Sequence, residues 1–383
     1  MRATKAIIHL DTLKSNISRL RAYHLQVGKT PDICFPVKAD AYGHGAVRVA
    51  KAAVEAGVKY LAVATVGEGA FLRERNLTVP ILLLSQCLPD EMETVYEFRL
   101  TPLVSDVETV NLLAKAVEKA PPHIQAKGRL SVFLKIDTGM GRAGCRPEDA
   151  HDLAEAIIDH RSLLRYAGTI THFAVSDSAH EEHIAYTREQ IAAFNKAVDS
   201  IRAACLNPGI VTAANSGGSV SYPDAWFDMV RPGIILYGYQ DSGMLPNLGF
   251  EPVMELVTQV VHTKTVRQGE SVSYGRTWTA EEDTVIGVLP IGYADGLPRI
   301  LSGNFSVAIG GKLYPLAGRI CMDQCMVNLG ANPAVKRWDD VTVFGGAPPS
   351  LNAADIAARI GTIPYEVTCN INQRVPRRYN PLY

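Results

Sequence analysis

The chain has 383 residues, of which 47% are hydrophobic and 20% charged, the proportions of a folded globular protein rather than a disordered one. Its 38 lysines and arginines nearly balance 39 aspartates and glutamates, giving a net charge of −1, so the chain lacks the cationic surplus typical of nucleic-acid-binding proteins. At about 150 residues per domain, this length predicts two domains.

The first residues form no signal-peptide core, because His9 and Asp11 interrupt the apolar stretch. The longest apolar run, residues 79–84, is far too short to span a bilayer. The seven cysteines are scattered, and the close pair Cys321 and Cys325 has no second pair or histidines beside it, which argues against a zinc site or a disulfide scaffold. We therefore expect a cytoplasmic protein in a reducing compartment, without a metal and without membrane contact.

Short apolar runs alternate with amphipathic stretches through the first part of the chain. The predicted strands are residues 33–37, 60–64, 80–84, 101–104, 130–136, 166–171, 210–213 and 230–237. The predicted helices are residues 11–23, 46–55, 106–118, 147–158 and 186–203. Eight strands with intervening helices are typical of a (β/α)8 TIM-type barrel, which we place at residues 1–243.

The composition changes after residue 239, where a segment rich in Gly, Pro and Asn predicts a linker. The β-prone segments beyond it are residues 257–266, 284–290, 305–309, 326–328 and 340–344, and one late helix is predicted at residues 353–360. We therefore predict an α/β protein in which the barrel is followed by a mostly β C-terminal domain at residues 244–383.

Polar residues gather at the carboxyl ends of the predicted barrel strands, where such barrels have their active sites. They are Lys38, Lys135, Arg142, His172, Asn215, Ser216 and Arg231. A lysine at a strand end is, taken alone, more often solvated than catalytic. Here, however, Ser216 and the glycines at 217 and 233 would form an anion cradle across the same barrel mouth. An amine facing a phosphate cradle is what pyridoxal phosphate requires.

Nine motifs follow one another in a specific order: PVKADAYGHG, KIDTGMGRAG, THFA, ANSG, RPGIILYG, VSYGRTW, IGYADG, GRICMDQ and IPYE. Together they resemble the pyridoxal-phosphate-dependent alanine racemases over essentially the whole chain. The resemblance implies an isomerase that interconverts L-alanine and D-alanine and provides D-alanine for peptidoglycan synthesis.

The resemblance also implies a two-base mechanism on a pyridoxal phosphate aldimine formed by Lys38. Lys38 would be one base, and Tyr274, supplied by the second domain of a partner subunit, the other. A tyrosine pKa near 10 must fall by about three units for this task. His172 would contact Tyr274, and Arg231 would contact His172 and the pyridine nitrogen. Because arginine can only donate a hydrogen bond, the cofactor would be a weaker electron sink.

Further roles follow from the same resemblance. Arg142 would contact the cofactor and the substrate carboxylate, and Lys135 matches a lysine that is carbamylated in some members. An ordinary charge pair of Lys135 with Asp137 or Glu148 is the alternative. The remaining cofactor ligands would be Tyr42, His172, Asn215, Ser216, Gly233, Ile234 and Tyr365. The substrate would meet Met322 and Asp323, and its entrance would be lined by Tyr293, Arg299, Arg319 and Asp177.

Other functions stay open at this point. One is a racemase of broader specificity that acts on serine; another is a non-catalytic pyridoxal-phosphate-binding barrel, against which the β domain with Tyr274 argues. A decarboxylase would need an acidic partner at the ring nitrogen, where Arg231 is expected instead. His180 and His183 lack the H-E-x-x-H order of a zinc site, and we expect them in a solvated loop. If Tyr274 serves the Lys38 of another copy, the protein is a homodimer.

Overall fold

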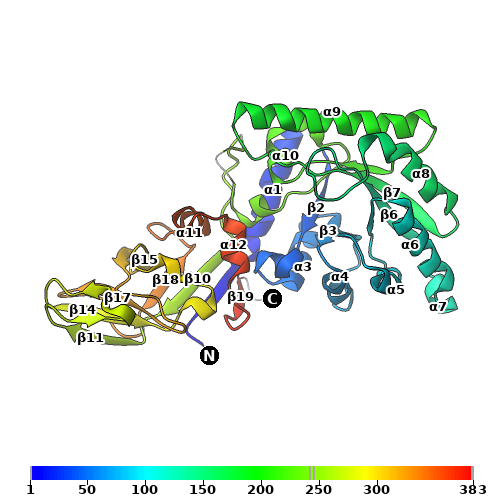
Figure 1. The fold of residues 1–383 in the computed structure, drawn as a ribbon. Coiled ribbons are helices and arrows are strands. Elements are labelled where there is room, and N and C mark those ends of the chain that lie inside the picture. The colour runs from blue at the N-terminus through cyan, green and yellow to red at the C-terminus, as the bar shows by residue number, and fades with distance from the viewer. Residues whose placement is uncertain (1, 241–242, 245, 381–383) are drawn as a thin grey trace.

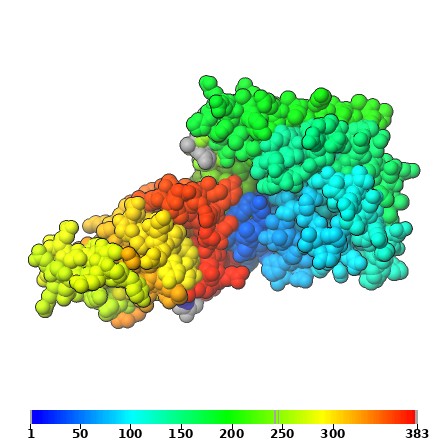
Figure 2. All heavy atoms as spheres, in the orientation of Figure 1, coloured from blue at the N-terminus to red at the C-terminus, as the bar shows by residue number. Residues whose placement is uncertain are grey.

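The computed structural model describes residues 2–240, 243–244 and 246–380. It has two parts, an α/β barrel and a β-rich arm that projects from it (Figure 1). The space-filling view in Figure 2 shows that the yellow-green end of the arm stands well away from the barrel.

Eight parallel strands form the barrel, in two four-stranded sheets with the orders β4-β3-β2-β9 and β5-β6-β7-β8. They are β2 (Asp32–Pro36), β3 (Tyr60–Val63), β4 (Ile81–Leu83), β5 (Leu103–Val104), β6 (Leu130–Lys135), β7 (Leu164–Ile170), β8 (Ile210–Thr212) and β9 (Met229–Val230). Backbone hydrogen bonds join the sheets: Thr101 donates to Ile81 at 2.8 Å on the β4 side, and Asp228 donates to Val211 at 3.1 Å on the β8 side. The predicted barrel is confirmed.

Helices cover the outside of the barrel (Figure 1). They are α1 (Leu10–Gln26), α3 (Ala46–Glu55), α4 (Val66–Arg73), α5 (Met92–Glu97), α6 (Val107–Lys119), α7 (Pro122–Gln125), α8 (Ala150–Asp159) and α9 (Glu181–Ala203). Helix α3 shows why helical spacing of apolar residues predicted these helices: Val49, Ala50 and Ala53 lie on one face and are all buried. Helix α9 begins earlier than predicted, so His183 lies in a helix and not in the expected loop.

Side chains of moderate size fill the barrel interior. One buried apolar cluster takes a residue from nearly every strand: Cys34, Ala62, Leu82, Leu103, Phe133, Ile170 and Met229. Phe133 fits only because Gly168 on the next strand has no side chain, since a Cβ there would lie 2.3 Å from the Phe133 ring. The barrel is thus a packed core, and ligands can reach only its ends.

The eighth strand was predicted wrongly as residues 230–237. It ends at Val230, and Ile234–Tyr237 form the 3-10 turn η4. Pro232 cannot donate a ladder hydrogen bond, and Gly233 turns the backbone (φ −102°, ψ −102°). The apolar run after it resembles a strand in sequence because all of η4 is buried.

The arm contains three sheets. The six-stranded sheet has the order β16-β15-β18-β10-β1-β19, the three-stranded sheet the order β11-β14-β17, and β12 pairs with β13. The strands are β1 (Lys5–His9), β10 (Met254–Gln259), β11 (His262–Val266), β12 (Ser271–Val272), β13 (Trp278–Thr279), β14 (Thr284–Leu289), β15 (Ser306–Ile309), β16 (Lys312–Pro315), β17 (Cys325–Gly330), β18 (Asp340–Phe344) and β19 (Arg377–Asn380). The predicted mostly β domain is confirmed.

Several features of the arm differ from the predictions, among them the unpredicted short strands β12, β13, β16 and β19. The single strand expected at residues 257–266 is two strands, because the chain leaves the β10 sheet after Gln259 and enters the β11 sheet at His262. The unpredicted strand β1 precedes the barrel in sequence but pairs with β10 and β19 in the arm. The barrel is therefore attached to the arm on both sides of its sequence.

Two short helices complete the described chain. Helix α11 (Ala353–Ile360) lies where it was predicted and begins at an Asn352 cap. Helix α12 (Pro364–Cys369) was not predicted; it returns to the barrel mouth, where the Tyr365 ring lies 5.4 Å from the ring of Tyr42. Among the residues described, none of the helices combines the length and apolarity needed to cross a membrane.

Candidate active site

A cavity of about 350 Å³ opens at the carboxyl ends of the barrel strands. The structure brings eleven of the predicted residues together on its walls: Lys38, Tyr42, Lys135, Arg142, His172, Asp177, Asn215, Ser216, Arg231, Gly233 and Tyr365. Ile234 directly follows Gly233 and is buried behind this wall. A larger hollow of about 630 Å³, lined partly by Ser131 and Arg165, lies at the amino ends of β6 and β7 and contains no predicted residue. Barrel chemistry occurs at the carboxyl ends, so the smaller cavity is the candidate site.

Lys38 begins an unusual turn, α2 (Lys38–Tyr42). Four consecutive residues after it have left-handed backbone angles, with φ values of 51°, 52°, 54° and 52° at Ala39, Asp40, Ala41 and Tyr42. Such angles cost non-glycine residues roughly 1–2 kcal/mol each, so the surroundings must stabilise the turn. The turn brings the side chains of both Lys38 and Tyr42 to the cavity.

Two carboxylates hold this turn in place. Glu68 Oε1 accepts a hydrogen bond from the Ala39 N–H at 2.7 Å, and Asp40 Oδ1 accepts one from the Ala46 N–H at 2.7 Å. Glu68 also forms a capping box with Thr65 at the start of α4. Lys38 is thus fixed by a residue on another helix, and strain is stored next to the proposed reacting group.

A polar cradle lines the cavity beyond the ends of β8 and β9. Asn215 caps α10 (Ser216–Ser221) by accepting from the Gly218 N–H at 3.1 Å, and Ser216 Oγ accepts from the Gly233 N–H at 2.9 Å. A Cβ at Gly233 would lie 2.9 Å from Tyr42 Oη. Glycine is therefore required if an anion is to approach the backbone here, and the cradle fits a phosphate group.

Arg231 is buried on the cavity wall beside this cradle. Its guanidinium donates to Thr212 Oγ1 at 2.5 Å and to the carbonyls of Thr171 at 2.6 Å and Ala213 at 3.0 Å. Burial lowers its pKa from 12.5 to about 10, so Arg231 remains protonated at neutral pH. A guanidinium in this position can offer only N–H donors to a ligand.

His172 lies next to Arg231, with 3.5 Å between His172 Nδ1 and an Arg231 N–H nitrogen. Burial, followed by the positive charge of Arg231, holds the pKa of His172 well below its usual 6.5. His172 is therefore neutral. With Nδ1 facing a donor, its proton belongs on Nε2, which can donate to another group.

Lys135 ends β6 deep in the site and is only 6% exposed. Burial, together with the positive charge of Arg231, lowers its pKa from 10.5 to about 7. Within the described part of the chain its amine has no ion pair or hydrogen bond, so the alternative pairing with Asp137 or Glu148 is not found. The Asp137 carboxylate instead accepts three backbone hydrogen bonds, from Gly139, Gly141 and Arg142.

That loop presents Arg142 to the cavity. Burial opposes ionisation of Asp137, but the N–H donors of the loop outweigh it and lower the pKa of this carboxyl. Burial, and after it the charge of Arg142, also lowers the pKa of Lys38. Lys38 thus has a larger neutral fraction than a surface lysine, which a nucleophile or base needs.

Six predicted residues lie in the arm and not in this cavity: Tyr274, Tyr293, Arg299, Arg319, Met322 and Asp323. They begin or belong to short turns and loops, η5 (Tyr274–Arg276), η6 (Tyr293–Asp295), η7 (Arg299–Leu301) and residues 319–324. The loops contact one another: Ser273 Oγ donates to the Arg319 carbonyl at 2.6 Å, and the Tyr293 N–H donates to the Cys321 carbonyl at 3.0 Å. Tyr274 is 70% exposed. None of these six residues lines the cavity of its own chain.

Two supporting residues were not predicted from the sequence, Glu68 and the backbone-binding Asp137. Both leave a local signal: the spacing of Thr65 and Glu68 is that of a capping box, and Asp137 is followed by glycines at 139 and 141. What the sequence does not show is that Glu68 also reaches the turn at Ala39.

An amine, a phosphate cradle and a buried guanidinium that line one barrel mouth define a barrel-type pyridoxal-phosphate enzyme. The sequence matches the family described as "Alanine racemase, N-terminal domain" over residues 8–241 and "Alanine racemase, C-terminal domain" over residues 253–379. The chain belongs to the alanine racemase family.

Individual relatives support this membership. The chain is 51% identical to an alanine racemase of Treponema denticola over 98% of both chains, and 43% identical to one of Treponema pallidum over 99% of this chain and all of the other. The structure of an alanine racemase from Streptomyces lavendulae has a TM-score of 0.90 at 33% identity, over all of this chain and 98% of that one. The alanine racemase of Bacillus anthracis, solved with L-Ala-P bound, has a TM-score of 0.88 at 31% identity, over 99% and 95%. The predicted family, enzyme class and cofactor are confirmed.

Proposed function

We propose that this chain interconverts L-alanine and D-alanine with pyridoxal phosphate attached at Lys38, and that its D-alanine serves peptidoglycan synthesis. The observation that carries the proposal is the cavity that Lys38 and the Ser216–Gly233 cradle both line. A covalent attachment point and an anion site in one cavity fit this cofactor, and the family supplies the substrate.

Racemisation needs a proton to leave one face of the substrate Cα and another to arrive at the opposite face. When bound, the cofactor supplies the electron sink that makes this carbon acidic. Lys38, with its lowered pKa, is the base on one face. The base on the other face would come from a second copy of the chain, which would complete the site.

Tyr274 of a second copy is the proposed base on the opposite face. Its 70% exposure leaves it free to enter a neighbouring site, which makes the active form a homodimer. His172 supports this role, because its Nε2–H is free to hydrogen-bond the phenol oxygen and favour the phenolate. Dilution to monomer should therefore abolish activity, and full turnover by a demonstrated monomer would refute the arrangement.

Arg231 is the proposed partner of the pyridine nitrogen. Its three oxygen acceptors hold the guanidinium in one orientation, with N–H groups as the only contact it can offer. A donor at this point would leave the ring nitrogen unprotonated and make the bound cofactor a weaker electron sink, which would disfavour side reactions such as transamination.

The remaining roles follow the shape of the site. Phosphate would be held by Tyr42, Ser216, Gly233, Ile234 and Tyr365, with Asn215 shaping the cradle. Arg142 would meet the substrate carboxylate, together with Met322 and Asp323 of the second copy. The entrance would be formed by Tyr293, Arg299 and Arg319 of that copy beside Asp177.

Lys135 is the proposed carbamylation site. An amine with a pKa of about 7 is substantially neutral at physiological pH and can add carbon dioxide. The carbamate would be an anion close to Arg142 and Arg231, whose charges both act on Lys135. Intact mass in bicarbonate buffer should show the adduct, and its absence in a Lys135→Met variant is the control.

The barrel and its cofactor site are assigned to residues 1–243, apart from strand β1 (Lys5–His9), which belongs to the sheet of the arm, and the β-rich domain is assigned to residues 244–383. The family matches, at residues 8–241 and 253–379, support a boundary in the linker between them. A cytoplasmic location is supported by the cysteines, since all seven are free thiols, as expected in a reducing compartment.

The decisive experiment measures racemisation of L-alanine and L-serine by the purified holoenzyme, with visible spectra before and after borohydride. Borohydride should fix the cofactor on Lys38, so Lys38→Ala should lose the label and activity together. Lys59→Ala removes an exposed lysine and is the matched control, which should keep both.

The outcomes separate the candidate functions. Faster turnover of alanine than of serine supports the proposal, whereas equal rates would indicate the broader-specificity racemase. A labelled Lys38 without racemisation of either amino acid would indicate a non-catalytic cofactor-binding barrel.

A further inference from the structure

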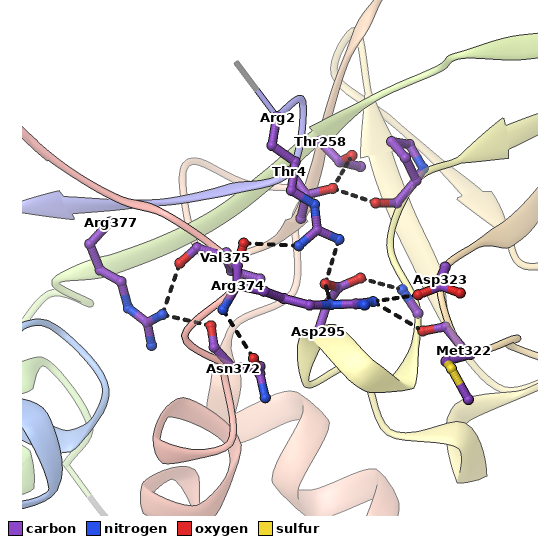
Figure 3. Close-up of polar contacts among 12 residues, drawn as sticks. Arg2, Thr4, Thr258, Asp295, Met322, Asp323, Asn372, Arg374, Val375 and Arg377 are labelled. Atoms are coloured by element: carbon purple, nitrogen blue, oxygen red, sulfur yellow. Dashed lines mark hydrogen bonds and ion pairs between the residues drawn. The ribbon is translucent and has the colours of Figure 1, made fainter.

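A buried carboxylate in the arm, Asp295, joins three distant parts of the chain (Figure 3). It ends the η6 turn and is fully buried. Its Oδ1 accepts from Arg2 at 2.5 Å and from Arg374 Nε at 2.6 Å, and its Oδ2 accepts from the Gly292 N–H at 2.9 Å. With two cations and one backbone donor around it, the carboxylate cannot change orientation without losing several charged hydrogen bonds.

Arg374 links the buried Asp295 carboxylate to residues at the surface. While its Nε binds Asp295, its Nη2 lies 2.8 Å from Asp323 Oδ1 and 3.4 Å from the Met322 carbonyl oxygen (Figure 3). The Asp323 side chain is 61% exposed, and without this contact it would sample many rotamers. One guanidinium thus connects an immobile buried carboxylate to an exposed one.

The loops on either side of this contact behave as one unit. The Tyr293 N–H donates to the Cys321 carbonyl at 3.0 Å, and the Ala294 N–H donates to the Met322 carbonyl at 3.0 Å. The turn that carries Tyr293 is therefore held by backbone hydrogen bonds to the loop that carries Met322 and Asp323. Arg374 contacts both segments, through Asp295 and Asp323.

The geometry points to Asp295 and Arg374 as positioning residues that orient Asp323 toward substrate in the active site of a second copy. Neither residue touches the substrate itself; each acts through Asp323. This inference rests on the proposed function, in which the 322–323 loop meets the substrate.

A purely structural role explains only half of the arrangement. Asp295 is already neutralised by Arg2, and the Gly292 N–H fixes its second oxygen. Exposed ion pairs such as Arg374–Asp323 add little to folding stability. The bond to Asp323 is better explained by the orientation it gives that side chain.

The test compares kcat and KM for L-alanine among Arg374→Gln, Asp323→Ala and the double variant. Each single change should raise KM about fivefold with little change in kcat, the loss expected for one partly exposed charged contact. Because Arg374 acts through Asp323, the double variant should also show about a fivefold rise. Arg374→Lys should restore part of the loss. Cofactor absorbance and dimer mass should not change.

Arg378→Gln is the matched control, since this exposed arginine of the same segment should leave KM unaltered. A KM rise of about 25-fold in the double variant would show independent effects and overturn the inference. So would a folded Arg374→Gln dimer with unaltered KM. If Arg374→Gln does not fold, Arg374→Lys, whose single ammonium cannot span both carboxylates, carries the test with the same expected coupling to Asp323→Ala.

Different results would refute the proposed function and the positioning inference. If the unmodified dimer does not racemise alanine, the proposed function is refuted and the inference with it. If the dimer racemises alanine and Asp323→Ala raises KM, but Arg374 variants do not, only the positioning inference is refuted.

Discussion

The buried amine of Lys135 should make the stability of the fold depend on pH in a way that one substitution removes. The unfolded chain has an ordinary lysine with a pKa of 10.5, whereas in the folded chain this pKa falls to about 7 because of burial and the charge of Arg231. Between these values the unfolded state binds more protons, so stability rises with pH across this window. Below about pH 7 Lys135 is protonated in both states, and the folded state carries the full free-energy penalty of burying its charge.

The magnitude follows from the two pKa values. The difference between 10.5 and about 7 corresponds to a penalty of about 5 kcal/mol at pH 6. At pH 9 the unfolded lysine is still mostly protonated while the folded one is neutral, and the penalty is about 2 kcal/mol. Lys135→Met has no titrating group, so relative to it the unmodified protein should gain about 3 kcal/mol from pH 6 to pH 9.

The assay is urea unfolding of the holoenzyme at pH 6 and pH 9, at one protein concentration and in buffer free of carbon dioxide. Carbon dioxide must be excluded because a carbamate would convert the amine to an anion. Lys59→Met, at an exposed position, controls for the loss of a lysine. If the difference in unfolding free energy between the unmodified protein and Lys135→Met is the same at pH 6 and pH 9, the reasoning is refuted, because burial would then not penalise this charge.

The site supports further tests. Tyr274→Phe should slow deuterium exchange at the Cα of L-alanine by about 100-fold or more and that of D-alanine much less; equal losses would contradict the assignment. Arg231→Glu should raise a long-wavelength absorbance with alanine present, because a carboxylate allows protonation of the ring nitrogen; an unchanged spectrum of the folded variant would oppose this role. Gly233→Ala should weaken cofactor affinity about tenfold or more, because its Cβ would lie 2.9 Å from Tyr42 Oη, whereas the Cβ of Gly67→Ala meets no atom within 4 Å and should leave affinity unchanged. Spectrophotometric titration with pyridoxal phosphate checks this pair, and equal affinities would argue against the cradle.

The barrel could be predicted because its strands leave a strong sequence pattern. Each is a short apolar run, and helices such as α3 bury residues at helical spacing. The same reasoning failed at residues 234–237, because a fully buried turn and a buried strand have the same composition. It also failed at Val260 and Val261, where the apolar run continues although the chain changes sheets.

The candidate site was partly predictable for a similar reason. Strand ends mark Lys38, His172 and Ser216 without any knowledge of contacts. The left-handed turn after Lys38 could not be predicted, since nothing in the residues Ala-Asp-Ala-Tyr favours four positive φ values. That conformation is imposed from outside by Glu68, and long-range contacts of this kind depend on how the helices pack.

Strand β1 has a consequence for how the protein is made. It lies between β10 and β19 in its sheet, and it is synthesised before the barrel while both neighbours are synthesised after it. Its buried residues Ala6 and Ile8 therefore remain without their final partners during translation of the whole barrel. The barrel can close on the ribosome, whereas the sheet of the arm is completed only once residues 377–380 have emerged. During that interval β1 is an exposed apolar strand, and it is the segment that a nascent-chain chaperone would protect.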